Sequence, residues 1–67
     1  MNYLFLDNGF EEIEAITTID LLRRANIALT TVSITGQPMV LGAHNIPVQA
    51  DGRIEDIDFS DAETLIL

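Results

Sequence analysis

Two short apolar segments lie near the opposite ends of this 67-residue chain. Residues 3–6 read Tyr-Leu-Phe-Leu, and residues 64–67 read Thr-Leu-Ile-Leu. Short apolar runs without polar alternation are typical of strands that are buried on both faces. Such strands belong to parallel sheets with helices on both sides, so the chain is predicted to be of the α/β class.

Residues 11–26 are predicted to form the helix that follows the first strand. Asn8 is a plausible N-cap, with Glu11 three residues later as in a capping box. Asn26 offers the left-handed stop that glycine usually provides. Residues 27–34 are rich in β-branched side chains and predict a second strand. A strand, a helix and a strand form a βαβ unit, in which the two strands are parallel.

The second half of the chain predicts a β-hairpin and a final strand. Residues 39–41 and 46–49 are expected to pair around a turn at residues 42–45, and Asp51-Gly52 marks another turn. Residues 53–61 form an acidic connection with at most one helical turn. Because a single helix cannot cover both faces of this sheet, residues 1–67 are expected to be the N-terminal part of a larger domain. The remainder of the polypeptide would then be the partner that covers the sheet.

The composition excludes several classes of protein. Eleven acidic and three basic residues give a net charge of -8, which disfavours binding to nucleic acid or to anionic membranes. No apolar run is long enough for a signal peptide or a membrane span, so a cytoplasmic location is expected. The chain has no cysteine and one histidine, so neither a disulfide nor a structural zinc site is expected, and no cofactor is predicted.

Glu14 is the most informative candidate for a functional residue. Each helical residue advances by about 100°, which places Glu14 in the apolar face among residues such as Ala15, Thr18 and Leu22. A buried carboxylate costs several kcal/mol unless it is paired or protonated. Two interpretations stay open: a first-turn acid that favours the helix dipole and reaches water, or a buried proton donor or acceptor for a catalytic group.

Ile13 and Ile16 lie on the opposite side of the same helix, where water would be expected. They are either scattered surface residues or a contact stripe with a polar rim made by residues such as Asp20 and Arg24.

Three further motifs have weaker interpretations. Asp7, at the carboxyl end of the first strand, lacks the second carboxylate that a phosphoacceptor site needs. His44 is the only residue with an ordinary pKa near neutrality, although a histidine at a hairpin tip is most often simply solvated. The segment from Asp56 resembles the start of a calcium loop, but it has Asp61 in place of the required glycine and Leu67 in place of the final glutamate.

Residues 9–15 (Gly-Phe-Glu-Glu-Ile-Glu-Ala) and 20–25 (Asp-Leu-Leu-Arg-Arg-Ala) closely resemble the start of the ThiJ/PfpI (DJ-one) superfamily. The resemblance continues to the final apolar strand and covers essentially the whole chain. It implies part of a doubly wound, flavodoxin-like parallel sheet sandwich, the class I glutamine amidotransferase-like fold. Family members continue beyond this point into a nucleophile elbow with a reactive cysteine, which these 67 residues lack.

The resemblance also implies roles for individual residues. Glu14 matches the glutamate that hydrogen-bonds to the cysteine and tunes it, and Gly9 and Phe10 match positions that line the site. Ile13 and Ile16 match a helix face used for homodimers. His44 falls where relatives approach the site of the neighbouring subunit. One departure is Asn26, which replaces the usual glycine.

By resemblance, the intact protein is expected to be a cysteine-dependent glyoxalase, deglycase or amidohydrolase-like enzyme. Its substrates would be small carbonyl or amide compounds, and this segment alone would be inactive. Two alternatives stay open: a non-enzymatic redox-sensing or chaperone-like homodimer of the stress response, and a small acidic binding module that stands alone.

Overall fold

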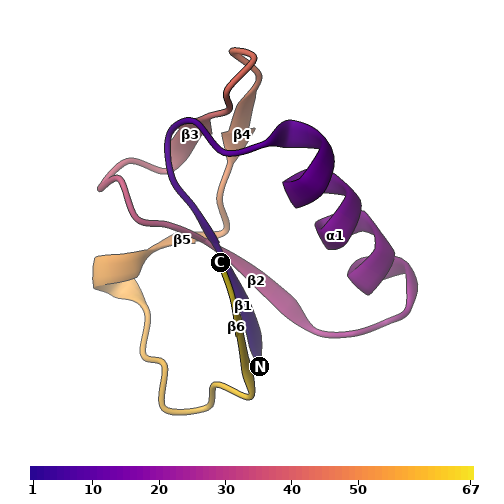
Figure 1. The fold of residues 1–67 in the computed structure, drawn as a ribbon. Helices are drawn as coiled ribbons and strands as arrows, with labels where there is room; N and C mark the ends of the chain where they lie inside the picture. Colours follow the sequence, from indigo (N-terminus) through magenta and orange to yellow (C-terminus); the bar gives the residue numbers. More distant parts are fainter.

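A computed structural model describes residues 1–67 and shows a four-stranded sheet with one helix and a separate hairpin (Figure 1). The sheet has the strand order β5-β2-β1-β6, and all its pairings are parallel. The elements, in chain order, are β1 (Asn2–Leu6), α1 (Glu12–Arg24), β2 (Leu29–Ser33), β3 (Met39–Leu41), β4 (Pro47–Gln49), β5 (Gly52–Arg53), the 3-10 helix η1 (Ile54–Asp56) and β6 (Thr64–Ile66). The predicted α/β class and parallel βαβ unit are confirmed.

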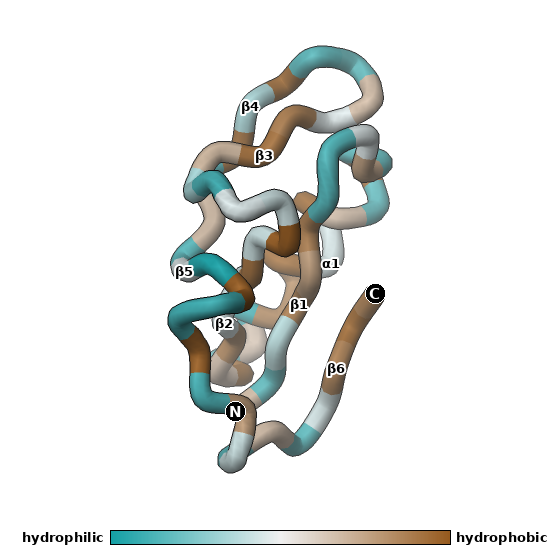
Figure 2. Tube along the Cα trace, turned by 90° about the vertical axis from the view of Figure 1, so that its left-hand side faces the viewer, coloured by the Kyte–Doolittle hydropathy of each residue, from teal (hydrophilic) through white to brown (hydrophobic).

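Strand β1 is the centre of the sheet. It pairs with β2 along one edge and with β6 along the other, so that Leu4 lies opposite both Thr31 and Ile66. Leu4 and Leu6 are almost fully buried and form the core together with Val40 of β3 and Ala50. In Figure 2, hydrophobic colours run along much of β1 and β6. The apolar first segment is therefore a buried strand, as predicted.

The two faces of the sheet are covered by different elements. Helix α1 lies over the face of Leu4 and Leu6, and Ala15 and Ile19 pack against the core from there. The connection that follows η1 covers part of the other face, where the ring of Phe59 lies 4.7 Å from Tyr3 and 5.7 Å from Phe5. The expectation of one bare sheet face is thus corrected, because Phe59 reaches back to β1 from within an acidic segment.

The ends of the helix differ from the sequence prediction. Helix α1 begins after Glu11, and Asn8 does not cap it. Instead, the Asn8 side-chain oxygen accepts a hydrogen bond from the Leu41 N–H at 3.0 Å, so this residue ties the first loop to the hairpin. At the other end, Asn26 adopts a φ of 60°, which confirms the left-handed stop. The next N–H, that of Ile27, then bonds to the Leu22 carbonyl.

The predicted strand and turn boundaries also need adjustment. Strand β2 begins at Leu29, two residues later than predicted, because the helix stop occupies the residues before it. Gly52 was predicted as part of a turn, but it begins β5 and pairs with Val32 at the edge of the sheet.

Helix α1 has 13 residues and is too short and too polar to cross a bilayer.

A titration of Tyr3 tests the packing of the connection against β1. The Tyr3 hydroxyl donates a hydrogen bond to Asp61 at 2.5 Å, and this bond, with burial and the nearby charges of Asp61 and Asp58, raises the pKa of Tyr3 to about 12. The chain contains one tyrosine, so phenolate absorbance near 295 nm reports this group alone when the segment is studied by itself. We expect a midpoint near pH 12 in the folded chain and near 10 in denaturant. Asp61→Asn should lower the folded midpoint, whereas Asp20→Asn, on the helix, should leave it unchanged.

Candidate functional site

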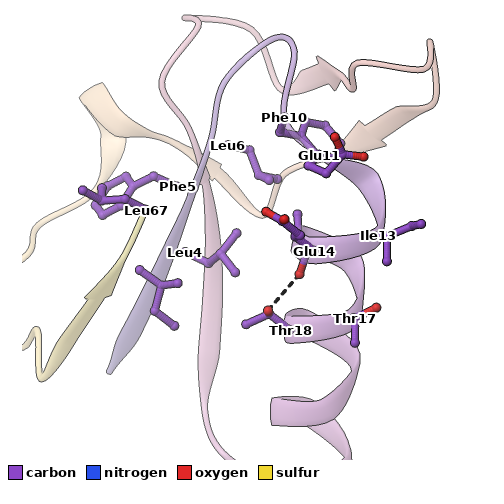
Figure 3. A pocket seen from close by; sticks show the side chains of 12 residues that line it. Leu4, Phe5, Leu6, Phe10, Glu11, Ile13, Glu14, Thr17, Thr18 and Leu67 are labelled. Carbon is purple, nitrogen blue, oxygen red and sulfur yellow. Dashed lines mark hydrogen bonds between the residues drawn. The ribbon is translucent and has the colours of Figure 1, made fainter.

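An open cavity of about 610 Å³ lies beside β1, β6 and the first turns of α1. Eight of its twelve lining residues are hydrophobic, among them Leu4, Leu6, Phe10 and Ile66. The polar lining residues, Glu11, Glu14, Thr17 and Thr18, all come from the start of α1 or the residue before it (Figure 3). An apolar concave surface with a few convergent polar groups is typical of a small-molecule site.

The carboxylate of Glu14 faces this cavity. Figure 3 shows it on the side of α1 that is turned toward Leu6, the last residue of β1. The helix is held at this point by Thr18, whose hydroxyl donates to the Glu14 carbonyl at 2.8 Å. The direction predicted from the helical wheel is therefore observed. Glu14 is exposed to solvent in this open cavity, which agrees with the first of the two interpretations, an acid of the first turn that reaches water.

The loop between β1 and α1 is fixed by hydrogen bonds to the hairpin. Gly9 adopts a φ of 90°, which favours glycine, and its N–H donates to the Leu41 carbonyl at 2.8 Å. The Phe10 carbonyl accepts from the Ala43 N–H at 2.8 Å. Phe10 lines the cavity, and Gly9, which is not among the lining residues, shapes the loop that carries Phe10. Their roles in a site stay predictions.

His44 lies away from the cavity and contacts Glu12. Its ring atom Nδ1 lies 2.8 Å from Glu12 Oε1, and its backbone N–H donates to Glu12 Oε2 at 2.6 Å. His44 is not among the residues that line the cavity of this chain, and its predicted approach to the site of a neighbouring subunit stays a prediction. The expectation of a purely solvated histidine is also too simple, because a side chain that is 70% exposed still carries this specific contact.

Glu12 is the residue that the sequence analysis missed. It belongs to the segment 9–15 that carries the family resemblance, but no separate role was predicted for it, and it is the sole buried residue of α1, with 5% of its surface exposed. The Gly42 backbone passes so close that an added Cβ would lie 2.8 Å from Glu12 Cγ and nearer still to the carboxylate. Glu12 and His44 are 32 positions apart, so no local pattern distinguishes Glu12 from Glu11 or Glu14.

The electrostatics of Glu12 and His44 are coupled. Burial raises the pKa of Glu12, but hydrogen bonds from the His44 ring and from the backbone N–H groups of His44, Glu12 and Ile46 outweigh it and lower that pKa to about 2. The hydrogen bond to Glu12, with the charges of Glu12 and Glu11, raises the pKa of His44 above its ordinary 6.5. The pair is therefore a carboxylate and an imidazolium at mildly acidic pH.

Glu11 completes a group of three possible metal ligands. One ligand atom from each of Glu11, Glu12 and His44 lies within 4.8 Å of the other two, and His44 Nδ1 lies 3.8 Å from Glu11 Oε1. A cluster of two carboxylates and one imidazole differs from both metal sites weighed from the sequence, a structural zinc site and a calcium loop from Asp56.

Ile13 and Ile16 are exposed, as predicted. Ile13 has 77% of its surface in contact with solvent and Ile16 has 41%. The helix therefore presents apolar side chains outward from the same turns that carry Glu12 and Glu14. Their role in an interface stays a prediction.

The pH dependence of stability tests the contact between Glu12 and His44. Because the pKa of folded Glu12 lies below its ordinary 4.5, its contribution is present above pH 4.5 and is lost as the pH falls toward 2. Because the pKa of folded His44 lies above 6.5, its contribution is complete below pH 6.5 and is lost as the pH rises through the raised value. We expect the stability difference between the unmodified protein and His44→Ala to be largest between pH 4.5 and 6.5.

Urea unfolding followed by circular dichroism, with a chelator present, measures this difference. His44 is the one histidine of the chain, so within these residues no other histidine contributes to the loss of stability as the pH rises above 6.5. A difference between the two proteins that does not vary with pH would show that the contact is not ionic.

Known proteins share both the sequence and the fold of this chain. The model of the DJ-1/PfpI family matches residues 2–67. The Parkinson disease protein 7 homolog of Danio rerio is 32% identical over 53 residues, which are 79% of this chain and 28% of that protein.

Solved structures give the same result. A DJ-1 superfamily protein from Salmonella typhimurium, solved as a cysteine-to-alanine mutant, is 38% identical with a TM-score of 0.79, over 82% of this chain and 30% of that chain. Oxidized DJ-1 of Toxoplasma gondii is 31% identical with a TM-score of 0.78, over 81% of this chain and 29% of that chain. The chain thus spans less than a third of the length of these relatives. The match over nearly all its residues shows that the chain belongs to the DJ-1/PfpI family.

Proposed function

We propose that this chain is the N-terminal part of a cysteine-dependent enzyme that acts on small reactive carbonyl or amide compounds, with Glu14 tuning the cysteine. The observation that supports this most directly is the Glu14 carboxylate, which faces an apolar cavity beside the carboxyl end of β1. Ligands of open parallel sheets bind at that edge.

The nucleophile must come from outside these residues, since the chain contains no cysteine. The chain spans about 30% of its Salmonella typhimurium relative, a protein whose structure was solved with one cysteine replaced by alanine. The remainder of the polypeptide is thus the proposed partner of the open cavity, and it would bring the thiol to Glu14.

Enclosure of the cavity would give Glu14 its chemical role. A protonated carboxyl group at this position, beside apolar side chains such as Leu6 and Phe10, can donate a hydrogen bond to a thiolate. That bond stabilises the thiolate and so lowers the thiol pKa. The thiolate then attacks the carbonyl carbon of the substrate: a carbon–sulfur bond forms, and the π electron pair moves to the oxygen, which takes up a proton.

Replacement of Glu14 tests this proposal in the natural protein that carries this sequence. We expect Glu14→Leu to raise the thiol pKa, measured by thiolate absorbance near 240 nm, by about one unit, which corresponds to roughly 1.4 kcal/mol. Turnover of methylglyoxal should fall by about tenfold or more at neutral pH. The matched control is Glu55→Leu, an exposed glutamate in η1 that does not line the cavity, which should change neither quantity. An unchanged thiol titration in Glu14→Leu would contradict the role of Glu14.

A redox-sensing or chaperone-like function is the second candidate, and one relative supports it, since the Toxoplasma gondii DJ-1 structure is of an oxidized form. Assays on the natural protein that carries this sequence distinguish the two functions. Methylglyoxal consumption by the reduced protein supports the enzyme. A peroxide-dependent mass increase that changes client binding, with no turnover, supports the sensor.

We further propose that Ile13 and Ile16 lie in a homodimer interface. In a two-fold interface each residue is buried twice, and full burial of an isoleucine contributes about 1.5–3 kcal/mol. Sedimentation of Ile13→Ser/Ile16→Ser should therefore show a dimer dissociation constant raised by about 100-fold or more. The control Ile27→Ser/Ile46→Ser alters two isoleucines of 41% and 47% exposure outside the helix. Equal effects in both double variants would place the interface elsewhere.

A further inference from the structure

We propose that Glu11, Glu12 and His44 form a binding site for one divalent transition-metal ion, with Zn²⁺ as the probe. The site joins the start of α1 to the turn between β3 and β4, and it does not depend on the proposed cysteine chemistry.

The geometry of the three ligands is close to that of a bound ion. Zinc lies about 2.0–2.2 Å from nitrogen and oxygen ligands, which in a tetrahedral site separates neighbouring ligand atoms by roughly 3.3–3.6 Å. His44 Nδ1 lies 2.8 Å from Glu12 Oε1, so these two atoms need to move apart by less than about 1 Å to bind one ion. Glu11 Oε1 lies 3.8 Å from the same nitrogen, and its side chain is exposed, so a rotation about its bonds can complete the site. Three protein ligands leave one or more coordination positions for water.

The ligand types select the class of metal. Imidazole suits zinc, copper and nickel, whereas magnesium and calcium prefer oxygen ligands alone. Zinc accepts both imidazole nitrogen and carboxylate oxygen as ligands, and catalytic zinc sites keep a position open for water.

The charge around the site independently points to a cation. The three basic side chains of the chain all pair elsewhere: Arg23 with Asp51, Arg24 with Asp20 and Arg53 with Asp56. Two carboxylates, one of them buried to 6% side-chain exposure, are therefore opposed by a single imidazole. A divalent ion would balance the negative charge that the imidazole leaves on the two carboxylates.

The surrounding structure holds the buried ligand in place. The His44 N–H donates a hydrogen bond to Glu12 Oε2 at 2.6 Å, and the other carboxylate oxygen, Oε1, faces the His44 ring. The turn that carries His44 is fixed to the helix side by the bond from the Ala43 N–H to the Phe10 carbonyl. Preorganised ligands of this kind increase metal affinity.

Titration of the natural protein with Zn²⁺ by calorimetry, and with Co²⁺ by visible spectroscopy, tests the site. Thiols are first blocked with iodoacetamide, so that a cysteine outside this chain cannot bind the metal. We expect one ion per subunit and the visible bands of Co²⁺ with nitrogen and oxygen ligands. His44→Ala should abolish binding, and Glu11→Gln should weaken it by about tenfold or more, whereas Glu55→Gln, the same change at a distant exposed glutamate, should have no effect.

Glu11→Gln keeps the test independent of folding, because this exposed side chain makes no hydrogen bond of its own in the structure, and circular dichroism checks the fold. The proposal is overturned if the alkylated protein binds no Zn²⁺ below millimolar concentration, or if Glu11→Gln and His44→Ala bind as tightly as the unmodified protein.

Discussion

The burial of β1 on both faces is the constraint on which the rest of the structure depends. Leu4 and Leu6 face the helix, while Tyr3 and Phe5 face Phe59. A strand with apolar groups on both sides needs a partner on each face and a neighbour on each edge. The chain supplies them in the order helix, β2, hairpin and β6, so the carboxyl end of β1 becomes the place where the loops and the cavity converge.

That convergence explains why a small hairpin matters for a site on the helix. The hairpin is fixed at two places: Val40 of β3 packs into the core, and the turn at Gly42 encloses Glu12. The loop before α1 lies between them and carries Phe10 to the cavity. The geometry around Glu14 therefore depends on contacts between residues more than thirty positions apart.

The sequence patterns predicted the features that depend on residues close together in the chain. The apolar strands, the helix, the left-handed Asn26 and the direction of Glu14 all follow from periodicity or from single-residue preferences. The missed features depend on long-range pairing. Asn8 has the residue type of a cap but bonds to Leu41, and Phe59 lies in an acidic segment yet packs on β1. Glu12 is chemically identical to its neighbours, and only the path of the hairpin makes it buried.

The first turn of α1 shows how one short segment can serve two sites. Glu12 and Glu14 are two positions apart, which separates them by about 200° around the helix axis. One carboxylate is thereby directed to the hairpin turn and the other to the cavity. Their surroundings differ, because Glu12 contacts Gly42 and His44, and neither of these residues lines the cavity that Glu14 faces. The proposed metal site and the proposed thiol site can therefore be tested separately in the same helix.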